Sequence, residues 1–324
     1  MKSSTKKLLS IILSLLIISS LFCGCDFFDF FLSKPSENSS DTSESESEKS
    51  SHDDDSKNWP VTVEGVTLDS KPTKVASLSP ALTEITFDLG YGSYLVCVSD
   101  YCDYPSEVSS LPKSGSPLIP DCDQIINSGA EILLTSSDLH SSYLAILNDA
   151  GIKTIVIPPA KSLPSLERLY KSVATVFDGK IDGSTAAKNF YNKCEETLSN
   201  CKDVVSSFGF SSKDPACVLY LRSLSPAIVA TVDTLESNLL ENIGFINAAS
   251  GYGDWNYPSA LVSSLAPDYI FYSSLIIPDD FVASDLYSAF SGNLKRFVLT
   301  DMSLFERQGK RMFDELYRAV SMMA

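Results

Sequence analysis

Residues 184–206, STAAKNFYNKCEETLSNCKDVVS, decide the fold of this chain. The stretch contains neither glycine nor proline, and its apolar side chains recur at helical spacing. That pattern predicts one continuous amphipathic helix. A helix of about 23 residues would be about 35 Å long, which is the diameter of a small domain. We therefore expect this helix to link two folded units and to limit how far they can move apart.

Short apolar runs alternate with helical stretches on both sides of this helix. Before it, the sequence predicts strands at residues 74–78, 94–98, 132–135 and 154–157, and helices at 81–89, 122–128 and 141–150. After it, the predicted strands are 216–221, 269–272 and 296–299, and the predicted helices are 235–243 and 305–322. Such alternation predicts parallel sheets covered on both faces. The expected fold class is α/β, with two lobes that each hold a parallel-type sheet flanked by helices, joined by one long helix.

The first residues have the composition of a secretory signal. Lysines near the N-terminus precede an apolar run at residues 8–21, which is shorter than the roughly 20 residues that a membrane-spanning helix needs. The next residues, LFCGC at 21–25, resemble the lipobox at which bacterial lipoproteins are cut and acylated. We expect lipidation at Cys25, with Cys23 as the alternative, and hence a lipid anchor on the extracytoplasmic face of the cell membrane. An ordinary signal peptide with two incidental cysteines is the other interpretation.

An acidic segment separates this signal from the folded region. Residues 36–58 are mainly Ser, Glu and Asp, so they cannot bury enough apolar surface to offset ordering entropy, and a disordered tether is predicted. The expected divisions are a signal peptide at 1–24, the tether at 25–58, an N-terminal lobe at 59–160, connecting helices at 161–206 and a C-terminal lobe at 207–324. The net charge of −16 argues against nucleic acid as a partner.

The expected folded region offers little to an enzyme or to a metal site. It contains a single histidine, His140, whereas zinc and manganese sites need clustered His, Asp and Glu ligands. It lacks a Gly-x-Ser-x-Gly elbow, and Glu84 and Asp103 are interpreted as acids on the lobe surface. We therefore expect no catalytic residue, no metal site and no cofactor.

The cysteines of this region leave their pairing open. Outside the cytoplasm disulfides can persist. Six cysteines without any CxxC pair lie at positions 97, 102, 122, 194, 201 and 217. Cys194 and Cys201 share a helical face but would be roughly 10 Å apart along the axis, too far to bridge. Buried free thiols are as well supported as any particular disulfide.

Several motifs carry a resemblance to a known family. Residues 74–84, KVASLSPALTE, and 98–105, VSDYCDYP, resemble the start of the helix-linked (class III) periplasmic binding proteins of ABC importers. In the second lobe, GFIN at 244–247 and LFER at 304–307 agree. Within the family, the chain is most similar to the vitamin B12 (cobalamin)-binding proteins. The resemblance covers nearly everything from residue 74 onward, and it implies a monomeric binding protein that captures a corrinoid and delivers it to a permease and its ATPase.

The resemblance also implies which residues contact the ligand. Tyr101 is similar in position to a tyrosine that faces cobalamin in the family. Trp255 falls close to a second-lobe tryptophan, and Arg307 to an arginine near the cleft. A corrinoid or a ferric chelate is broad, flat and partly apolar, so its cleft needs aromatic faces and a few polar anchors.

Departures from the family pattern leave the ligand open. Where cobalamin binders carry two first-lobe tryptophans, this chain has Pro117 or Leu118 and Ser136. Tyr257 is a candidate replacement for a stacking face, as are Tyr252 and Tyr143. A ferric siderophore, or haem with His140 or a tyrosine as axial ligand, is therefore an alternative cargo. A surface adhesin on the same scaffold is the alternative to transport.

Docking to a permease in this family uses an acidic residue from each lobe. Asp123, with Asp121 beside it, matches the first-lobe position, whereas Ala260 occupies the second-lobe position. The resemblance therefore implies that docking depends mainly on the first lobe. The alternative is that the two aspartates only stabilise the N-terminus of the following helix.

Overall fold

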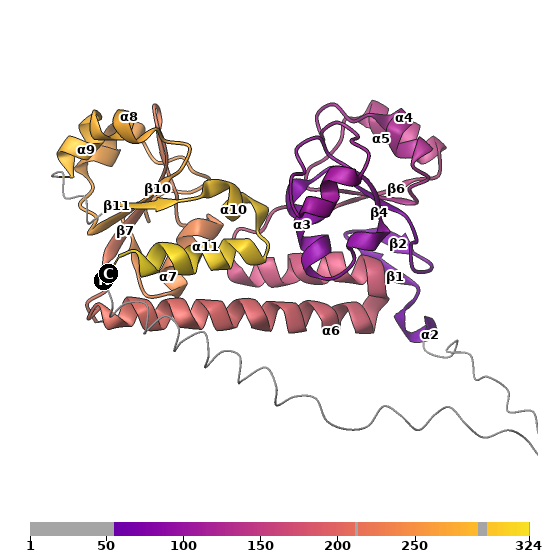
Figure 1. Ribbon diagram of the computed structural model, residues 1–324, viewed down its shortest axis with the longest axis horizontal. Helices are drawn as coiled ribbons and strands as arrows, with labels where there is room; N and C mark the ends of the chain where they lie inside the picture. The colour runs from indigo at the N-terminus through magenta and orange to yellow at the C-terminus, as the bar shows by residue number, and fades with distance from the viewer. Residues whose placement is uncertain (1–54, 211–212, 291–296, 324) are drawn as a thin grey trace, which may run out of the picture. The chain divides into compact units, whose positions relative to one another are not determined.

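The computed structural model describes residues 55–323, except 211–212 and 291–296. The predicted signal peptide, the lipobox cysteines and nearly all of the predicted tether lie outside the described residues. Two larger β-sheets and one two-stranded sheet occupy the described part, and the two larger sheets lie one on each side of the long helix α6 in the sequence (Figure 1). We call the part up to β6 the first lobe and the part from β7 onward the second lobe. The predicted α/β fold class is confirmed.

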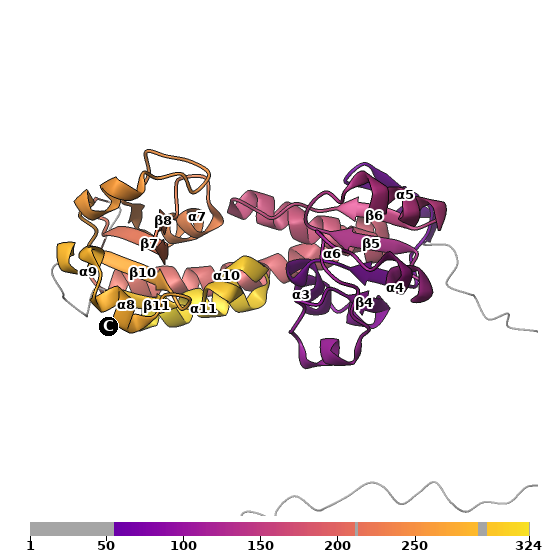
Figure 2. The same cartoon turned by 90° about the horizontal axis from the view of Figure 1, so that it is seen from above.

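The first lobe is built on a four-stranded parallel sheet in the order β4-β3-β5-β6. Its strands are β3 Val75–Ser77, β4 Leu95–Val98, β5 Ile132–Thr135 and β6 Lys153–Val156. Its helices are α3 Pro80–Asp88, α4 Cys122–Asn127 and α5 Ser141–Asp149, with the 3-10 turns η1 Gly92–Tyr94 and η2 Ser106–Ser110. All four strands were predicted to within about a residue. Helices lie on both sides of the sheet (Figure 2), so the central strands β3 and β5 are buried at every position.

A hairpin missed by the sequence prediction precedes this sheet. It consists of β1 Val61–Val63 and β2 Val66–Leu68, which pair antiparallel, and it follows the short helix α2 Asp55–Asn58. Glu64 and Gly65 form its turn, with φ angles of 46° and 82°. Positive φ at both central residues is the conformation that tight hairpins require. Strands of three residues are too short for a periodicity argument to detect.

The linking helix α6 spans Leu163–Ser207 and is broken once, at Gly179. There φ is 72° and ψ is −162°, and the chain reverses so that a second helical segment runs back along the first (Figure 1). Only glycine fits, because a Cβ atom would lie 2.7 Å from the backbone oxygen of Asn58. The Asn58 side-chain oxygen accepts hydrogen bonds from the backbone N–H groups of Ile181 and Asp182, which caps the second segment.

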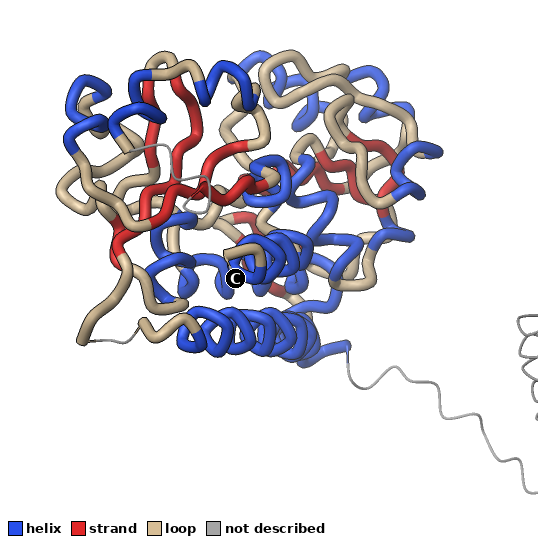
Figure 3. Tube along the Cα trace, turned by 60° about the vertical axis from the view of Figure 1, so that its left-hand side comes forward, coloured by secondary structure: helices blue, strands red, loops and turns tan. Residues whose placement is uncertain are grey.

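The second segment of α6 contains the predicted helix 184–206. Its seven apolar residues at helical spacing, Ala187, Phe190, Tyr191, Cys194, Leu198, Cys201 and Val205, are all buried. The helix runs along one side of both sheets (Figure 3). The amphipathic reading of this stretch is therefore correct.

The second lobe holds a sheet in the order β11-β10-β7-β8, and β9 also pairs with β7. The strands are β7 Cys217–Leu224, β8 Ala227–Val229, β9 Ile246–Asn247, β10 Tyr269–Ser273 and β11 Phe297–Thr300. The helices are α7 Leu235–Asn242, η3 Ser259–Ser264, α8 Pro278–Val282, α9 Asp285–Ala289, α10 Met302–Arg307 and α11 Lys310–Ser321. Only β8 is antiparallel to its neighbour.

The prediction of one helix over residues 305–322 is wrong. Gln308, with φ of 56°, separates α10 from α11. Its side chain donates to the backbone oxygen of Ala160 at 2.9 Å and accepts from the Ala160 N–H at 2.8 Å. The Gln308 backbone oxygen also accepts a hydrogen bond from the buried Tyr170 hydroxyl at 2.6 Å. Contacts with distant residues therefore hold this break in place.

The start of α11 is attached to α3 of the first lobe. Arg311 donates two hydrogen bonds to Glu84, at 2.9 and 2.6 Å, and its guanidinium lies 3.6 Å from the centre of the Tyr104 ring. The Glu84 side chain is 1% exposed, so its interpretation as a surface acid is wrong. Asp88 accepts a hydrogen bond from the Lys310 N–H at 2.8 Å. These contacts fix the second lobe against the first at one point.

The six cysteines in the described part of the chain are free thiols, and five of them are buried. Burial raises the pKa of Cys194 and of Cys201 to about 12. Within residues 55–323, with the gaps given above, no helix is long and apolar enough to span a membrane.

Candidate ligand-binding cleft

A cavity of about 300 Å³ lies where the first-lobe strands end against α10 of the second lobe. Ser79 follows β3, Tyr101 follows β4, Ser136 follows β5 and Ile157 follows β6, and all four line the cavity. Parallel strands bring their carboxyl ends to one edge of a sheet, which is where open α/β sheets bind ligands. From the second lobe, Ser303, Glu306 and Arg307 line the opposite side. We call this cavity the interlobe cleft.

Arg307 reaches across the interlobe cleft. Its guanidinium donates to the backbone oxygen of Tyr101 at 3.5 Å and to the Asp103 carboxylate at 3.0 Å. The Arg307 side chain is only 15% exposed, whereas that of Asp103 is 72% exposed. An ion pair with one solvated partner contributes roughly 0–1 kcal/mol, so a ligand can displace it at small cost.

The loop after β4 presents Tyr101 to the cleft. Gly115 donates its N–H to the Asp100 carboxylate at 3.0 Å, and Tyr101 donates its N–H to the Ser99 hydroxyl at 3.3 Å. These bonds hold the backbone on both sides of the loop while the Tyr101 side chain remains 67% exposed. An ordered loop that leaves a large aromatic ring in solvent is suited to contact with a flat ligand.

Trp255 does not line the interlobe cleft. Its backbone N–H donates to the Thr231 hydroxyl at 3.0 Å, and its half-buried ring lies edge-on to Tyr220, 6.4 Å between centres. The Arg222 guanidinium lies 5.1 Å from the centre of the Trp255 ring and forms an ion pair with Glu306 at 2.7 Å. Arg222 thus lies between Trp255 and Glu306, which lines the cleft.

The other predicted site residues divide between the cleft and the surface. Ser136 lines the cleft with Tyr101 and Arg307. Leu118 is 86% exposed on a loop that does not contribute to the cleft, and Tyr257 packs edge-on against Tyr252 at 4.7 Å on the second lobe.

Two further predicted residues occupy helix N-termini. Asp123 is exposed in the first turn of α4, where Asp121 is the N-cap and accepts a hydrogen bond from the Gln124 N–H at 2.9 Å. His140 is the N-cap of α5, with its Nδ1 atom 3.3 Å from the Ser142 nitrogen. Asp121 and His140 therefore cap helices. Among the described residues, the Asp123 carboxylate forms no ion pair, so it is available to a partner protein.

Sequence reasoning missed a charged cluster behind the cleft. It comprises Arg222, Glu306 and the buried Glu236 in the first turn of α7. Burial raises the pKa of Glu236 to about 7, and the charge of Arg222 opposes this shift. The neighbouring residues Glu306 and Arg307 were a usable signal for this cluster. Successive residues on a short helix can face two different partners, and here Glu306 pairs with Arg222 while Arg307 pairs with Asp103.

Comparison with known proteins identifies the family. A family model described as periplasmic binding protein matches residues 75–293. The chain belongs to the periplasmic binding protein family. It is 30% identical over 223 residues to an uncharacterized ABC transporter substrate-binding lipoprotein of Bacillus subtilis, a match that covers 65% of this chain and 68% of the relative. It is thus a substrate-binding protein of the ABC-importer type and not an enzyme.

Solved structures share the periplasmic binding protein fold. The vitamin B12 binding protein of Vibrio cholerae superposes with a TM-score of 0.58 at 18% identity, over 78% of this chain and 96% of that one. An apo haem-binding protein from Roseiflexus sp. RS-1 gives a TM-score of 0.63 at 20% identity, over 77% and 97%. At these identities the similarity establishes the helix-linked fold and leaves the ligand open.

Proposed function

We propose that this protein captures a corrinoid, such as cobalamin, in the interlobe cleft and delivers it to the permease and ATPase of an ABC importer. The observation that carries the proposal is the cleft itself, at the carboxyl ends of four parallel strands, faced by an exposed Tyr101 and by Arg307. The protein acts as a monomer without a cofactor of its own. The vitamin B12 binding protein of similar fold supports this choice of ligand.

The chemistry of the cleft suits such a ligand. A corrinoid offers a flat face to an aromatic ring and a rim of amide groups to hydrogen-bonding side chains. Tyr101 supplies the ring, while Ser79, Ser136 and Arg307 supply polar groups. Because about 300 Å³ is at the lower end of small-molecule pockets, binding must widen the cleft and break the Arg307–Asp103 pair.

A haem or a ferric siderophore is the second candidate. Tyr101 is an exposed phenol that lines the cleft, and a tyrosine can bind ferric iron directly. The haem-binding protein of similar fold supports this alternative. His140 gives it no support, because this residue caps α5 and does not line the cleft.

The location we propose is the extracytoplasmic face of the cell membrane. Residues 1–24 would be removed as a signal peptide, Cys25 would carry the lipid, and residues 25–58 would contain the tether that precedes the lobes at 59–160 and 207–324. The last four residues of that segment are not tether, because they form α2, and Asn58 caps the second segment of α6. The lipoprotein relative from Bacillus subtilis supports an anchor of this kind.

Docking to the permease is proposed to use Asp123. This carboxylate is exposed at the N-terminus of α4, away from the residues that line the cleft. The corresponding second-lobe residue, Ala260 in η3, carries no charge. A rim charge of this kind steers orientation and encounter rate more than affinity.

A competition experiment tests the choice of ligand. The protein would be incubated with equal concentrations of cobalamin, haem and a ferric catecholate siderophore and then separated from free ligand by gel filtration. The absorption spectrum of the protein fraction would identify the bound ligand. We expect a corrinoid spectrum that Tyr101→Ala weakens strongly and Tyr143→Ala, on α5 outside the cleft, leaves unchanged. A haem spectrum would replace the first candidate with the second, and no bound ligand would contradict both.

A further inference from the structure

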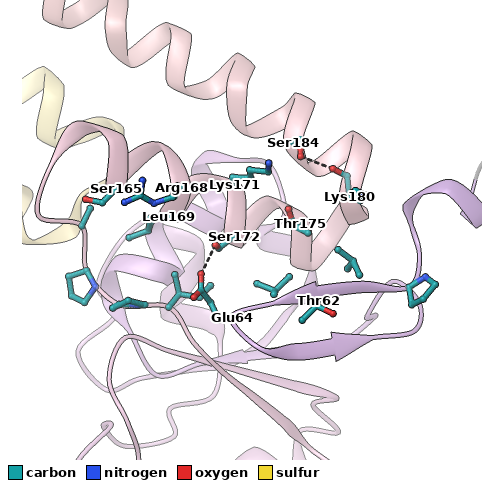
Figure 4. Close-up of a pocket in the computed structure, with 17 residues that line it drawn as sticks. Thr62, Glu64, Ser165, Arg168, Leu169, Lys171, Ser172, Thr175, Lys180 and Ser184 are labelled. Atoms are coloured by element: carbon teal, nitrogen blue, oxygen red, sulfur yellow. Dashed lines mark hydrogen bonds between the residues drawn. The ribbon is translucent and has the colours of Figure 1, made fainter.

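A second and larger cavity lies on the first lobe, between strand β1 and helix α6 (Figure 4). Its volume is about 720 Å³, and we call it the β1–α6 groove. It shares three lining residues with the interlobe cleft, namely Ile157, Pro159 and Leu169, and otherwise draws on different parts of the chain. The ligand cleft therefore does not account for this groove.

Three cationic side chains line the β1–α6 groove. Arg168 and Lys171 come from the first segment of α6, and Lys180 from the start of the second (Figure 4). All three are exposed, and none forms an ion pair with any residue that the structure describes. In a chain of net charge −16, with 41 acidic residues, three cations without an ion pair gather around this one cavity.

The backbone holds these cations together. Arg168 and Lys171 are three residues apart and therefore share a face of the helix. The reversal at Gly179 returns the chain, so that Lys180 joins the same groove from the second segment. Asn58 contacts Gly179 closely and caps the second segment, which fixes the reversal without any ligand. The positive side of the groove is thus preformed.

The opposite side of the groove supplies neutral polar groups and one acid. Thr62 and Glu64 come from β1 and its turn (Figure 4). Glu64 accepts a hydrogen bond from the Ser172 hydroxyl at 2.8 Å and forms no ion pair with any of the three cations. The groove consequently carries an excess of two positive charges.

We propose that the β1–α6 groove binds a phosphate-bearing anion. The planar guanidinium of Arg168 matches two phosphate oxygens, and the ammonium groups of Lys171 and Lys180 add charge without a fixed geometry. The volume is that of a small-molecule site. The phosphate can come from a soluble phosphorylated molecule or from the headgroup of a phospholipid. None of the three cations lines the interlobe cleft, so this site and the corrinoid site use different charged groups.

Lysine labelling tests this proposal on the full chain in neutral detergent micelles. Acetylation rates of Lys171 and Lys180 would be measured by mass spectrometry with inorganic pyrophosphate added, or with phosphatidylglycerol or phosphatidylcholine added to the micelles. Lys188 and Lys202 are internal controls, because both are exposed on the second segment of α6 and neither lines the groove. We expect the labelling of Lys171 and Lys180 to slow several-fold while the controls remain constant.

A matched pair of variants completes the test. Arg168→Gln should raise the concentration needed for half-protection by about tenfold, whereas Lys188→Gln, the same loss of charge outside the groove, should not. Protection by pyrophosphate identifies a soluble phosphate as the source, and protection by phosphatidylglycerol alone identifies a headgroup. If neither probe protects the two lysines selectively, or if both variants weaken protection equally, the proposal is wrong. Corrinoid binding in the interlobe cleft would be unaffected by that failure.

Discussion

The pair formed by Arg311 and Glu84 gives the sharpest prediction about the way in which the lobes are held. The Glu84 side chain is 1% exposed and the Arg311 side chain is 29% exposed, so water reaches Arg311 but not Glu84. Arg311→Gln leaves a buried carboxylate without its cation, whereas Glu84→Gln leaves a guanidinium that water can reach. We therefore expect Arg311→Gln to be the more destabilising change.

The magnitude follows from the burial of the two partners. Removing one partner of a fully buried ion pair costs roughly 3–5 kcal/mol. Because water reaches part of this site, we expect about 3 kcal/mol for Arg311→Gln and about 1 kcal/mol for Glu84→Gln. In a protein of this size about 3 kcal/mol corresponds to a fall in Tm of about 6–12 °C.

Urea and thermal unfolding followed by circular dichroism would measure these losses. Asp314→Asn is the matched control, because it breaks the ion pair of Asp314 with Lys310 on the same helix, in which both side chains are about half exposed. That change should cost less than about 0.5 kcal/mol. If Arg311→Gln costs no more than Asp314→Asn, or if Glu84→Gln costs more than Arg311→Gln, the reasoning about this contact is refuted.

Three further changes test other parts of the account. Cys25→Ser should release the protein from the membrane fraction into the medium, and a variant that stays bound to membranes would exclude lipidation at this residue. Asp123→Lys should slow uptake in cells without changing ligand affinity, whereas Asp149→Lys, an exposed charge at the end of α5, should change neither. Burial raises the pKa of Glu236 from 4.5 to about 7, so the folded protein retains a proton that the unfolded chain releases, and the free energy of unfolding should fall as the pH rises from about 4.5 to about 7. Glu236→Gln should remove that part of the fall, about 2 kcal/mol between pH 5 and pH 8 in urea unfolding, and an unchanged pH dependence would contradict the assignment.

Local patterns in the sequence predicted the elements that depend on local causes. The strand at 132–135 matches β5 because three consecutive apolar residues and Thr135 are buried in the centre of a parallel sheet. The helix at 184–206 follows from side-chain periodicity alone. The prediction began it after Gly183, yet α6 continues through this residue. Glycine is required there because a Cβ would lie 2.7 Å from the Ala174 backbone oxygen. That glycine serves packing between two helical segments and does not end a helix.

Features created by distant residues could not be predicted in this way. The left-handed conformation of Gln308 depends on Ala160 and Tyr170, more than a hundred positions away. The burial of Glu84 depends on Arg311, a partner 227 positions later.

The cleft illustrates the same limit. Tyr101 and Arg307 came from the family resemblance, and the structure brings them together across 206 positions. The resemblance placed Trp255 at the ligand, whereas in the structure Trp255 does not line the cleft and Arg222 lies 5.1 Å from the centre of its ring. A pairing of this kind has no signature in local spacing.

Calorimetric titration of the protein with cobalamin and cobinamide tests the central claim most directly. We predict that at least one corrinoid binds one site per monomer with a Kd in the micromolar range or tighter. Tyr101→Ala should weaken binding by about thirtyfold, which is about 2 kcal/mol for an aromatic side chain in contact with the ligand. Failure of both corrinoids to bind at micromolar concentration, or an unchanged Kd for Tyr101→Ala, would contradict a corrinoid site in the interlobe cleft.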